Sequence, residues 1–226
     1  MDLQFHQCTV RFGARTALEP LTLHVEGRRL GVVGLNGSGK TTFVRLLNAL
    51  TLPTEGRVTV NGLDTAAEPD RVRAEAGFVF QHPQNQLIMP VVREDIAFGL
   101  RARGASTADA ESRAEAALAR FGIMELGPRR IHELSGGELQ LAAMASVTAL
   151  EPRILILDEP TNQLDLRNRR RVVDAITALD EDCVVVTHDL DLAATLPRLL
   201  LFHEGRLAAD GPPNTVLGRY REIAGC

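Results

Sequence analysis

The chain has 226 residues, which is long enough for one large domain or two small ones with a sizeable core. Hydrophobic residues make up 45% of the sequence and charged residues 24%, as in ordinary globular proteins. The net charge of −4 argues against a broad nucleic-acid-binding surface, so no nucleic acid is expected among the partners.

The first third of the chain is predicted to consist of short strands joined by turns, and the expected fold includes an N-terminal antiparallel β subdomain. Strands are expected over residues 3–12, 21–25, 29–34, 57–62 and 77–80. Between the third and fourth strands, apolar residues at helical spacing predict a helix over residues 41–50, which Pro53 ends.

The middle of the chain, residues 83–150, has a different composition. Alanine becomes frequent and runs of β-branched residues disappear. Residues 106–122 predict a helix that Gly122 closes. Its inward side chains are expected to be Ala114, Ala117, Leu118 and Phe121. We therefore predict an α-helical subdomain over residues 83–150, inserted into a strand-rich core formed by residues 1–82 and 151–226.

Strands return after Pro152. The runs at 154–157 and 184–186 are apolar on both faces, which suits central strands of a parallel sheet that helices cover. Residues 198–202 and 206–210 are expected to form a hairpin. The alternation of strands and helices indicates an α/β fold with a mostly parallel sheet.

A glycine-rich segment, residues 34–42, lies between a predicted apolar strand and a predicted helix. This is the context of a phosphate-binding loop. Its glycines let backbone N–H groups face phosphate oxygens, and Lys40 adds a full positive charge. The Thr41 hydroxyl is placed to bind Mg²⁺. A plain Gly/Ser-rich turn is the alternative, but the strand before it and the helix after it favour phosphate binding.

Three other predicted strands end on polar side chains: Asp158 with Glu159, His188, and Gln81. Ligand sites of parallel α/β sheets lie at the carboxyl ends of strands, so these side chains are expected to meet. Asp158 is expected to bind Mg²⁺. Glu159 is expected to deprotonate a water that attacks a γ-phosphate, and His188 is expected to contact that phosphate. The alternatives are acids that cap a turn and a structural histidine ahead of the N-cap residue Asp189. Gln81 can meet Mg²⁺ or water, although it is a weak signal alone.

The segment Leu-Ser-Gly-Gly-Glu, residues 134–138, precedes an apolar run. Ser135 followed by Glu138 is a capping box, which predicts that a helix begins here. Gly136 and Gly137 occupy its first turn, where each costs about 1 kcal/mol relative to alanine. Because glycine has no Cβ, a phosphate could approach the backbone N–H groups at these positions more closely than any other residue would allow. The Ser135 hydroxyl would be a further hydrogen-bond donor to it. A flexible glycine turn is the alternative.

The cysteines, the first residues and the lengths of the aliphatic runs indicate the cellular compartment that is expected for the chain. Cys8, Cys183 and Cys226 are far apart and lack the spacing of metal ligands, so reduced thiols in a cytosolic protein are predicted. The first residues lack the basic and apolar parts of a signal peptide. The longest aliphatic runs are far shorter than the roughly 20 residues that span a bilayer. A membrane role would therefore come through a partner.

Together these segments resemble the nucleotide-binding subunits of ABC transporters. Residues 34–42 resemble the Walker A loop, Gln81 the Q-loop, residues 134–138 the family signature, residues 155–160 the Walker B strand, residues 162–165 the D-loop, and His188 the switch histidine. The spacing is also similar, with 20 residues from Glu138 to Asp158 and 30 from Asp158 to His188. The resemblance covers essentially the whole chain and implies a P-loop NTPase with a RecA-like core.

The resemblance implies ATP and Mg²⁺ as ligands, and it assigns residues to them. ATP-binding residues would be Phe12, Asn36, Gly37, Ser38, Gly39, Lys40, Thr41, Thr42, Ser135, Gly136, Gly137 and Glu138. Thr41, Gln81 and Asp158 would hold the metal, and Lys40, Gln81, Glu159 and His188 would serve catalysis. Phe12 would stack on adenine, with core packing as its alternative role. Two subunits of this family pack head to tail, and the signature of one completes the ATP site of the other, so a homodimer is implied.

Within the family, residues 80–99 most resemble the ATPases of energy-coupling factor importers, through Gln81, Pro83, Gln86, Leu87 and residues 94–99. This implies a peripheral subunit at the cytoplasmic face of the membrane, bound to a transmembrane coupling protein and a small substrate-binding membrane protein. Biotin is the implied cargo, and a cobalt or nickel importer is the closest alternative.

Other classes of nucleotide-binding protein remain as alternatives. A soluble ABC-type ATPase uncoupled from transport would typically carry a coiled-coil insertion or a second cassette. A GTP switch would need an Asn-Lys-x-Asp motif, and residues 161–165 do not supply one. Glu159 and His188 together argue against a module that binds nucleotide without hydrolysing it.

Overall fold

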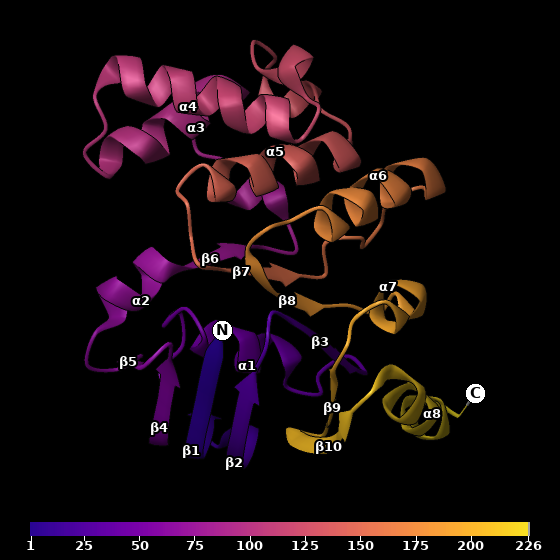
Figure 1. The fold of residues 1–226 in the computed structure, drawn as a ribbon. Helices are drawn as coiled ribbons and strands as arrows, with labels where there is room; N and C mark the ends of the chain where they lie inside the picture. Colours follow the sequence, from indigo (N-terminus) through magenta and orange to yellow (C-terminus); the bar gives the residue numbers. More distant parts are fainter. Residues whose placement is uncertain (226) are drawn as a thin grey trace. The chain divides into compact units, whose positions relative to one another are not determined.

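The computed structural model describes residues 1–225, and its contacts divide the chain into two compact units (Figure 1). The first unit comprises Met1–Ala76, Arg153–Glu159 and the chain from Glu181 onward, and the second comprises Gly77–Pro152 and Pro160–Asp180. Each unit has its own core and is described by itself.

The first unit contains the antiparallel β subdomain that the sequence predicts. Its strands are β1 (Asp2–Phe12), β2 (Arg15–Glu26), β4 (Glu55–Val60) and β5 (Leu63–Asp64), in the order β2-β1-β4-β5. Leu3 of β1 pairs with Val25 on one side and Val60 on the other, and all three are buried. The Phe5 ring stacks on that of Phe43, with the centroids 4.9 Å apart, so this sheet shares a core with the phosphate-loop helix.

The second sheet of this unit is mostly parallel, as predicted. Its strands are β3 (Arg29–Gly34), β7 (Ile154–Asp158), β8 (Asp182–Val186), β9 (Leu199–His203) and β10 (Arg206–Gly211), in the order β10-β9-β3-β8-β7. Val32 of β3 pairs in parallel with Val186 of β8 and Leu200 of β9. The pairing of Arg206 with His203 closes the predicted hairpin. The helices of this unit are α1 (Lys40–Leu46), α2 (Pro69–Glu75), α7 (Leu190–Ala194) and α8 (Pro213–Ala224).

The helix after the phosphate loop is shorter than predicted. α1 ends at Leu46, not at residue 50. Ala49 has a left-handed backbone with φ 55°, and the N–H groups of Leu50 and Thr51 both donate to the carbonyl of Arg45. The apolar spacing continued past the helix because the turn that follows it also packs into the core: Leu47 is fully buried.

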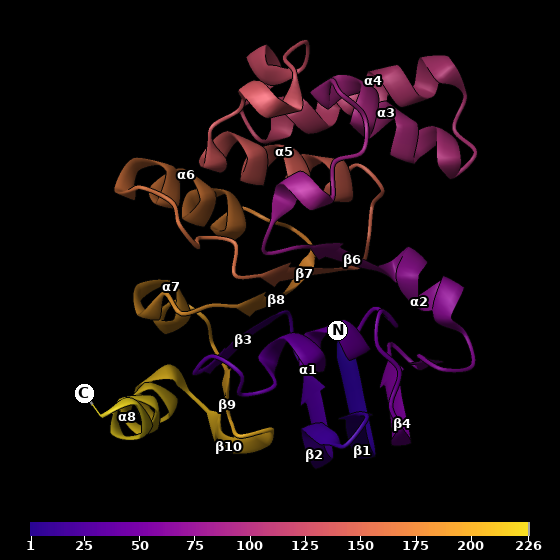
Figure 2. The same cartoon turned by 180° about the vertical axis from the view of Figure 1, so that it is seen from behind.

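The second unit is mainly helical (Figure 2). It contains β6 (Ala76–Val79), which begins on the last residue of the first unit, then the 3₁₀ turn η1 (Pro83–Asn85), α3 (Val92–Ala102), α4 (Thr107–Arg120), the turns η2 (Met124–Leu126) and η3 (Ile131–Glu133), α5 (Gly136–Thr148) and α6 (Leu166–Thr177). Helices α3, α4 and α5 pack against one another, and α6 packs against α5.

Helix α4 forms where the sequence predicts it. The Ser106 hydroxyl caps it by accepting from the N–H of Asp109 at 3.2 Å, and Gly122 follows its end with φ 63°. Ala114, Ala117 and Leu118 are buried as expected, whereas Phe121 is only half-buried.

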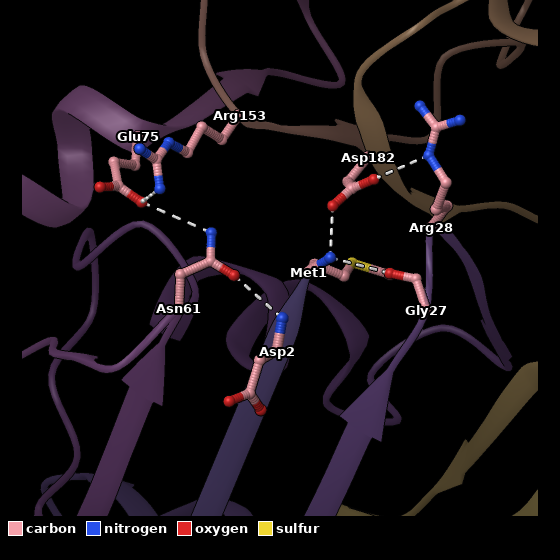
Figure 3. Close-up of polar contacts among 8 residues, drawn as sticks. All are labelled: Met1, Asp2, Gly27, Arg28, Asn61, Glu75, Arg153 and Asp182. Carbon is pink, nitrogen blue, oxygen red and sulfur yellow. Dashed lines mark hydrogen bonds and ion pairs between the residues drawn. The ribbon is translucent and has the colours of Figure 1, made fainter.

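A polar cluster in the first unit joins the two sheets (Figure 3). The Met1 amino group forms an ion pair with Asp182 of β8 and donates to the Gly27 carbonyl at 2.9 Å. The other oxygen of Asp182 accepts from Nε of Arg28 at 3.2 Å. These contacts tie the start of β1 to the start of β8, an interior strand of the parallel sheet.

A second chain of contacts in the same figure starts at Asn61. Its Oδ1 accepts from the N–H of Asp2 at 2.9 Å, and its Nδ2 donates to Glu75 at 3.4 Å. Glu75 lies 3.9 Å from Arg153, which immediately precedes β7. The turn after β4 is thereby joined to both β1 and α2.

The two described cysteines are expected to be unreactive in the folded protein. Cys8 and Cys183 are buried and free, and burial raises the pKa of each thiol to about 12. Because thiolate is the reactive form, a Cys226→Ser variant should show no fast-reacting thiol with a disulfide reagent at pH 8, and two after unfolding. A rapid native phase amounting to one thiol would contradict this. Cys226, the third predicted thiol, lies outside the described residues.

Candidate active site

The phosphate loop lies between β3 and α1, as predicted, and needs glycine for steric reasons. Gly34 has φ 151°, and a Cβ there would lie 2.2 Å from the carbonyl oxygen of Phe202. Gly39, the N-cap of α1, has φ 103°, and its Cβ would lie 2.8 Å from the carbonyl oxygen of Ala17. The loop therefore passes too close to neighbouring backbone for any other residue. Asn36, one of the loop residues predicted to bind phosphate, has an exposed side chain.

Three predicted ligand residues, Ser38, Thr41 and Thr42, are partly or wholly buried. Ser38 is buried, and its Oγ has no hydrogen-bond partner among the described residues. Thr41 and Thr42, in the first turn of α1, are half-buried. A buried hydroxyl without a partner is rare in folded proteins, which is consistent with a ligand that supplies one.

Lys40 occupies the centre of the site and is only 6% exposed. Its Nζ donates to the carbonyls of Gly34 at 2.8 Å and Leu35 at 3.1 Å. It also lies 3.4 Å from His188 Nε2 and 4.0 Å from Glu159 Oε1. Burial lowers the pKa of Lys40, while the nearby carboxylates of Glu159 and Asp158 act in the opposite direction.

Asp158, the last residue of β7, is buried beside this lysine. Burial raises the pKa of its carboxyl group, and the neighbouring Glu159 adds to the rise. Arg45, a hydrogen bond with the Thr41 side chain, and Lys40 partly offset it. Its Oδ1 has no hydrogen-bond partner among residues 1–225. An oxygen donor held next to a threonine hydroxyl is the kind of ligand pair that a hard divalent cation prefers.

Glu159 and His188 face each other at the ends of neighbouring strands. Glu159 Oε1 lies 2.9 Å from His188 Nε2, and Oε2 accepts from the backbone N–H of His188 at 3.3 Å. Glu159 has φ 55°, an uncommon backbone conformation for a residue with a side chain, and its N–H donates to the carbonyl of Val186. Of the side chains predicted at strand ends, the structure thus brings Asp158, Glu159 and His188 together, beside Lys40 of the phosphate loop.

The signature segment begins helix α5, as the capping box predicts. Ser135 is the N-cap, with its Oγ accepting from the N–H of Glu138 at 3.4 Å, and Glu138 Oε2 accepts from the N–H of Ser135 at 2.8 Å. These bonds, the Ser135 hydroxyl and Arg129 hold the pKa of Glu138 below its ordinary value. Ser135 Oγ also donates to Glu138 at 2.7 Å. Ser135 would therefore have to give up this bond to Glu138 in order to donate its hydroxyl proton to a phosphate.

The structure gives one signature glycine a second role that the sequence did not reveal. A Cβ on Gly137 would lie 2.5 Å from the Cβ and Cγ of Asn168, on α6. A Cβ on Gly136 would meet only the end of the Leu164 side chain, at 3.3 Å. Gly137 therefore permits close packing of α6 on α5, whereas packing does not require glycine at 136.

The two remaining predicted residues are exposed. Phe12 ends β1 and is 57% exposed, so core packing does not account for it. Gln81 is exposed in the loop after β6 and belongs, like the signature, to the second unit. Within residues 1–225, no helix is long and apolar enough to cross a membrane.

A strand, a glycine loop and a helix that present a lysine to two carboxylates at strand ends define a P-loop NTPase. Residues 18–162 match the ABC transporter family, and the chain belongs to that family. It is an ATP hydrolase of this family. The α/β fold and the resemblance that the sequence predicts are thereby confirmed.

Relatives and solved structures support the assignment along the full chain. The biotin transport ATP-binding protein BioM of Rhizobium etli is 62% identical over 99% of this chain and 100% of its own length. The energy-coupling factor transporter ATP-binding protein EcfA1 of Symbiobacterium thermophilum is 41% identical over 92% of this chain and 75% of its own. The structure of CbiO1 from Clostridium perfringens, part of the ABC transporter complex CbiONQ, aligns with a TM-score of 0.85 at 27% identity, covering 99% of this chain and 93% of that one.

Proposed function

We propose that this chain is the ATP-hydrolysing subunit of an energy-coupling factor importer for biotin. The observation that carries the proposal is the 62% identity to the Rhizobium etli biotin transport ATP-binding protein over 99% of this chain and the whole of that protein. The cluster of Lys40, Asp158, Glu159 and His188 supplies the chemistry that such a subunit needs.

Lys40 and the loop N–H groups would neutralise the phosphates of ATP. Asn36, Gly37, Ser38, Gly39 and Thr42 would complete the phosphate cradle, and Phe12 would stack on adenine. The partnerless oxygen of Asp158, its hydrogen bond with Thr41 and the position of both beside Lys40 fit a Mg²⁺ ion. Thr41 and Asp158 would hold this ion, with Gln81 as a further ligand, and the ion would offset the charge that develops on the phosphates.

Hydrolysis would depend on Glu159 and His188. Glu159 is placed to take the proton from a water that attacks the γ-phosphate. His188 would fix the Glu159 carboxylate through their contact of 2.9 Å and would meet the γ-phosphate with the same ring. Gln81 would orient the water and sense the metal from the second unit.

A homodimer would complete each site. Ser135, Gly136, Gly137 and Glu138 would receive the phosphates of ATP bound to the phosphate loop of a second copy, with N–H groups at the start of α5 facing the ligand. Residues 83–150 would then act as a helical subdomain that shifts against the core residues 1–82 and 151–226 when two ATP molecules are bound. Residues 81–100 would transmit this motion to the membrane partners.

The membrane partners would be a transmembrane coupling protein and a small substrate-binding membrane protein, with this chain peripheral at the cytoplasmic face. The test is to delete the gene and measure uptake of radiolabelled biotin, and to purify the chain from native membranes in mild detergent. Uptake that is lost, restored by the wild-type chain and not restored by Glu159→Gln would support the proposal. Copurification of two polytopic proteins would support the partners.

Other outcomes would redirect the assignment. Unchanged biotin uptake with lost nickel or cobalt uptake would replace biotin with a metal ion as the cargo. Recovery only as a free ATP-dependent dimer, across several detergents, with all uptake unchanged, would overturn the importer proposal and leave the ATPase intact.

A further inference from the structure

A buried carboxylate in the second unit lies outside the active site. Asp95, in the first turn of α3, is only 6% exposed. It falls on the face of α3 that also buries Val92, Ile96 and Leu100, where an apolar residue would be expected. A charged group in such a place is costly unless its oxygens are hydrogen-bonded, so its partners show what the charge does there.

One oxygen of Asp95 holds the loop that precedes α3. Its Oδ1 accepts from the backbone N–H groups of Ile88 and Met89, at 2.6 Å and 3.0 Å. The Ile88 side chain is 75% exposed, although it is a large apolar residue. Asp95 thus fixes the backbone of a loop that presents an apolar side chain to the surroundings.

The other oxygen of Asp95 is bonded to the signature helix. Its Oδ2 accepts from the Ser146 hydroxyl at 3.1 Å, and Ser146 lies near the C-terminal end of α5. A longer contact of 3.5 Å, from Gln86 Nε2 to the Ala143 carbonyl, links the same loop to the same helix. Hydrogen bonds to a charged acceptor are stronger than those between neutral groups, so the Asp95 bridge is the firmer link.

Helix α5 begins at the signature. Ser146 lies eleven positions after Ser135, which is about 16 Å along a helix axis at 1.5 Å per residue. α5 is one uninterrupted helix from Gly136 to Thr148, so its two ends are joined by a continuous ladder of backbone hydrogen bonds. A displacement of its N-terminal end would reach Ser146, and the bridge would pass it to the loop.

We propose that Asp95 is a positioning residue that couples the signature helix to the loop at residues 87–90 through Ser146. The inference rests on the proposed function, because nucleotide at Ser135 supplies the displacement and a membrane partner receives it. Without the bridge, the signature end would still respond to ATP, but the exposed loop would respond much less.

The test is hydrogen exchange, followed by mass spectrometry, of peptides that cover residues 86–90 and 136–148. It is run in the Glu159→Gln chain with and without ATP, so that the ATP-bound form persists. ATP is expected to slow exchange in both segments. Adding Ser146→Ala should leave the response of α5 in place and reduce that of the loop by about threefold or more, since one hydrogen bond to a charged group is lost.

Two matched variants control for general destabilisation. Thr148→Val removes a hydroxyl from the same helix, but among the described residues this hydroxyl bonds only to the Met144 and Ala145 carbonyls of α5, so the loop should respond as before. Asp95→Asn should also preserve the response, because its amide can accept from Ile88 and Met89 and donate to Ser146. Asp95→Ala, which removes both oxygens, should abolish the response of the loop to ATP.

Transport provides an independent readout. In chains with Glu159 intact, Ser146→Ala should leave basal ATP hydrolysis unchanged and lower biotin uptake, while Thr148→Val lowers neither. A loop that responds to ATP equally with and without Ser146 would overturn the inference while leaving the proposed function standing. Absence of any ATP response at residues 136–148 in the Glu159→Gln reference would contradict the proposed function, and the inference with it.

Discussion

Replacement of Glu159 by glutamine is expected to lower ATP hydrolysis by about 100- to 10,000-fold, the usual contribution of a general base. Glutamine keeps the size of the side chain and an oxygen that can accept from the N–H of His188, but it cannot accept a proton from water. ATP binding should persist because Lys40 and the phosphate loop are unchanged. The bound ATP should accumulate in a dimer, since the step that consumes it is blocked.

The measurement combines steady-state phosphate release with size-exclusion chromatography in the presence of Mg²⁺ and ATP. Glu222→Gln is the matched control, because Glu222 makes an exposed ion pair with Arg219 within α8, which carries none of the site residues, and such pairs contribute little. This control should hydrolyse ATP at the wild-type rate and form no trapped dimer. A Glu159→Gln chain with wild-type turnover would show that another group takes the proton.

Buried parallel strands were the most predictable part of the fold. The runs in β7 and β8 are apolar on both faces, and each is covered on both sides in the structure. Helices were harder to predict where the spacing of apolar residues does not match the extent of the helix. α2 buries only Val72, so it has no apolar face to recognise, and α1 stops while the apolar spacing continues through Leu47.

The cluster at the strand ends could be predicted because it depends on topology. Once β3, β7 and β8 are parallel neighbours, Lys40, Asp158 and Glu159 must approach one another, and His188 follows from the same rule. The direct contact of Glu159 with His188 could not be predicted, since it depends on the left-handed backbone at Glu159.

Contacts between segments far apart in the sequence were missed for a different reason. Asp95 could have been noticed, because Val92, Ile96 and Leu100 recur at helical spacing and the acid falls on the same side as these apolar residues. Its partner Ser146, 51 residues away, carries no such signal. Likewise, nothing in the sequence around Gly137 points to Asn168, whose side chain occupies the space that a Cβ would need.

Alanine substitutions at Gly136 and Gly137 should distinguish two roles of the signature glycines, which are access for the phosphate and close packing of α6 on α5. Gly136→Ala is expected to retain or raise thermal stability, because alanine favours a helix by about 1 kcal/mol and only the flexible end of Leu164 must move. Hydrolysis should nevertheless fall, because the new Cβ lies where phosphate approaches the helix start.

Gly137→Ala is expected to lower both thermal stability and ATP hydrolysis. Its Cβ would overlap the Cβ and Cγ of Asn168 at 2.5 Å, and such overpacking typically destabilises by about 1–3 kcal/mol. At this chain length each kcal/mol corresponds to a fall in Tm of roughly 2–4 °C. Hydrolysis should fall by at least as much as in Gly136→Ala, since packing and ligand approach are both disturbed.

A double-mutant cycle with Asn168→Gly distinguishes the two effects of Gly137→Ala. Asn168→Gly removes the atoms that the new Cβ would meet, so Gly137→Ala should lower Tm much less in that background than in the wild-type chain. Hydrolysis should not recover, because Gly137→Ala still adds a side chain to the first turn of α5, whose N–H groups would bind the phosphate. Equal losses of Tm in both backgrounds would show that α6 packing does not require Gly137. Recovery of hydrolysis together with Tm would show that the glycine serves packing alone, and that the signature receives phosphate without needing a bare backbone at this position.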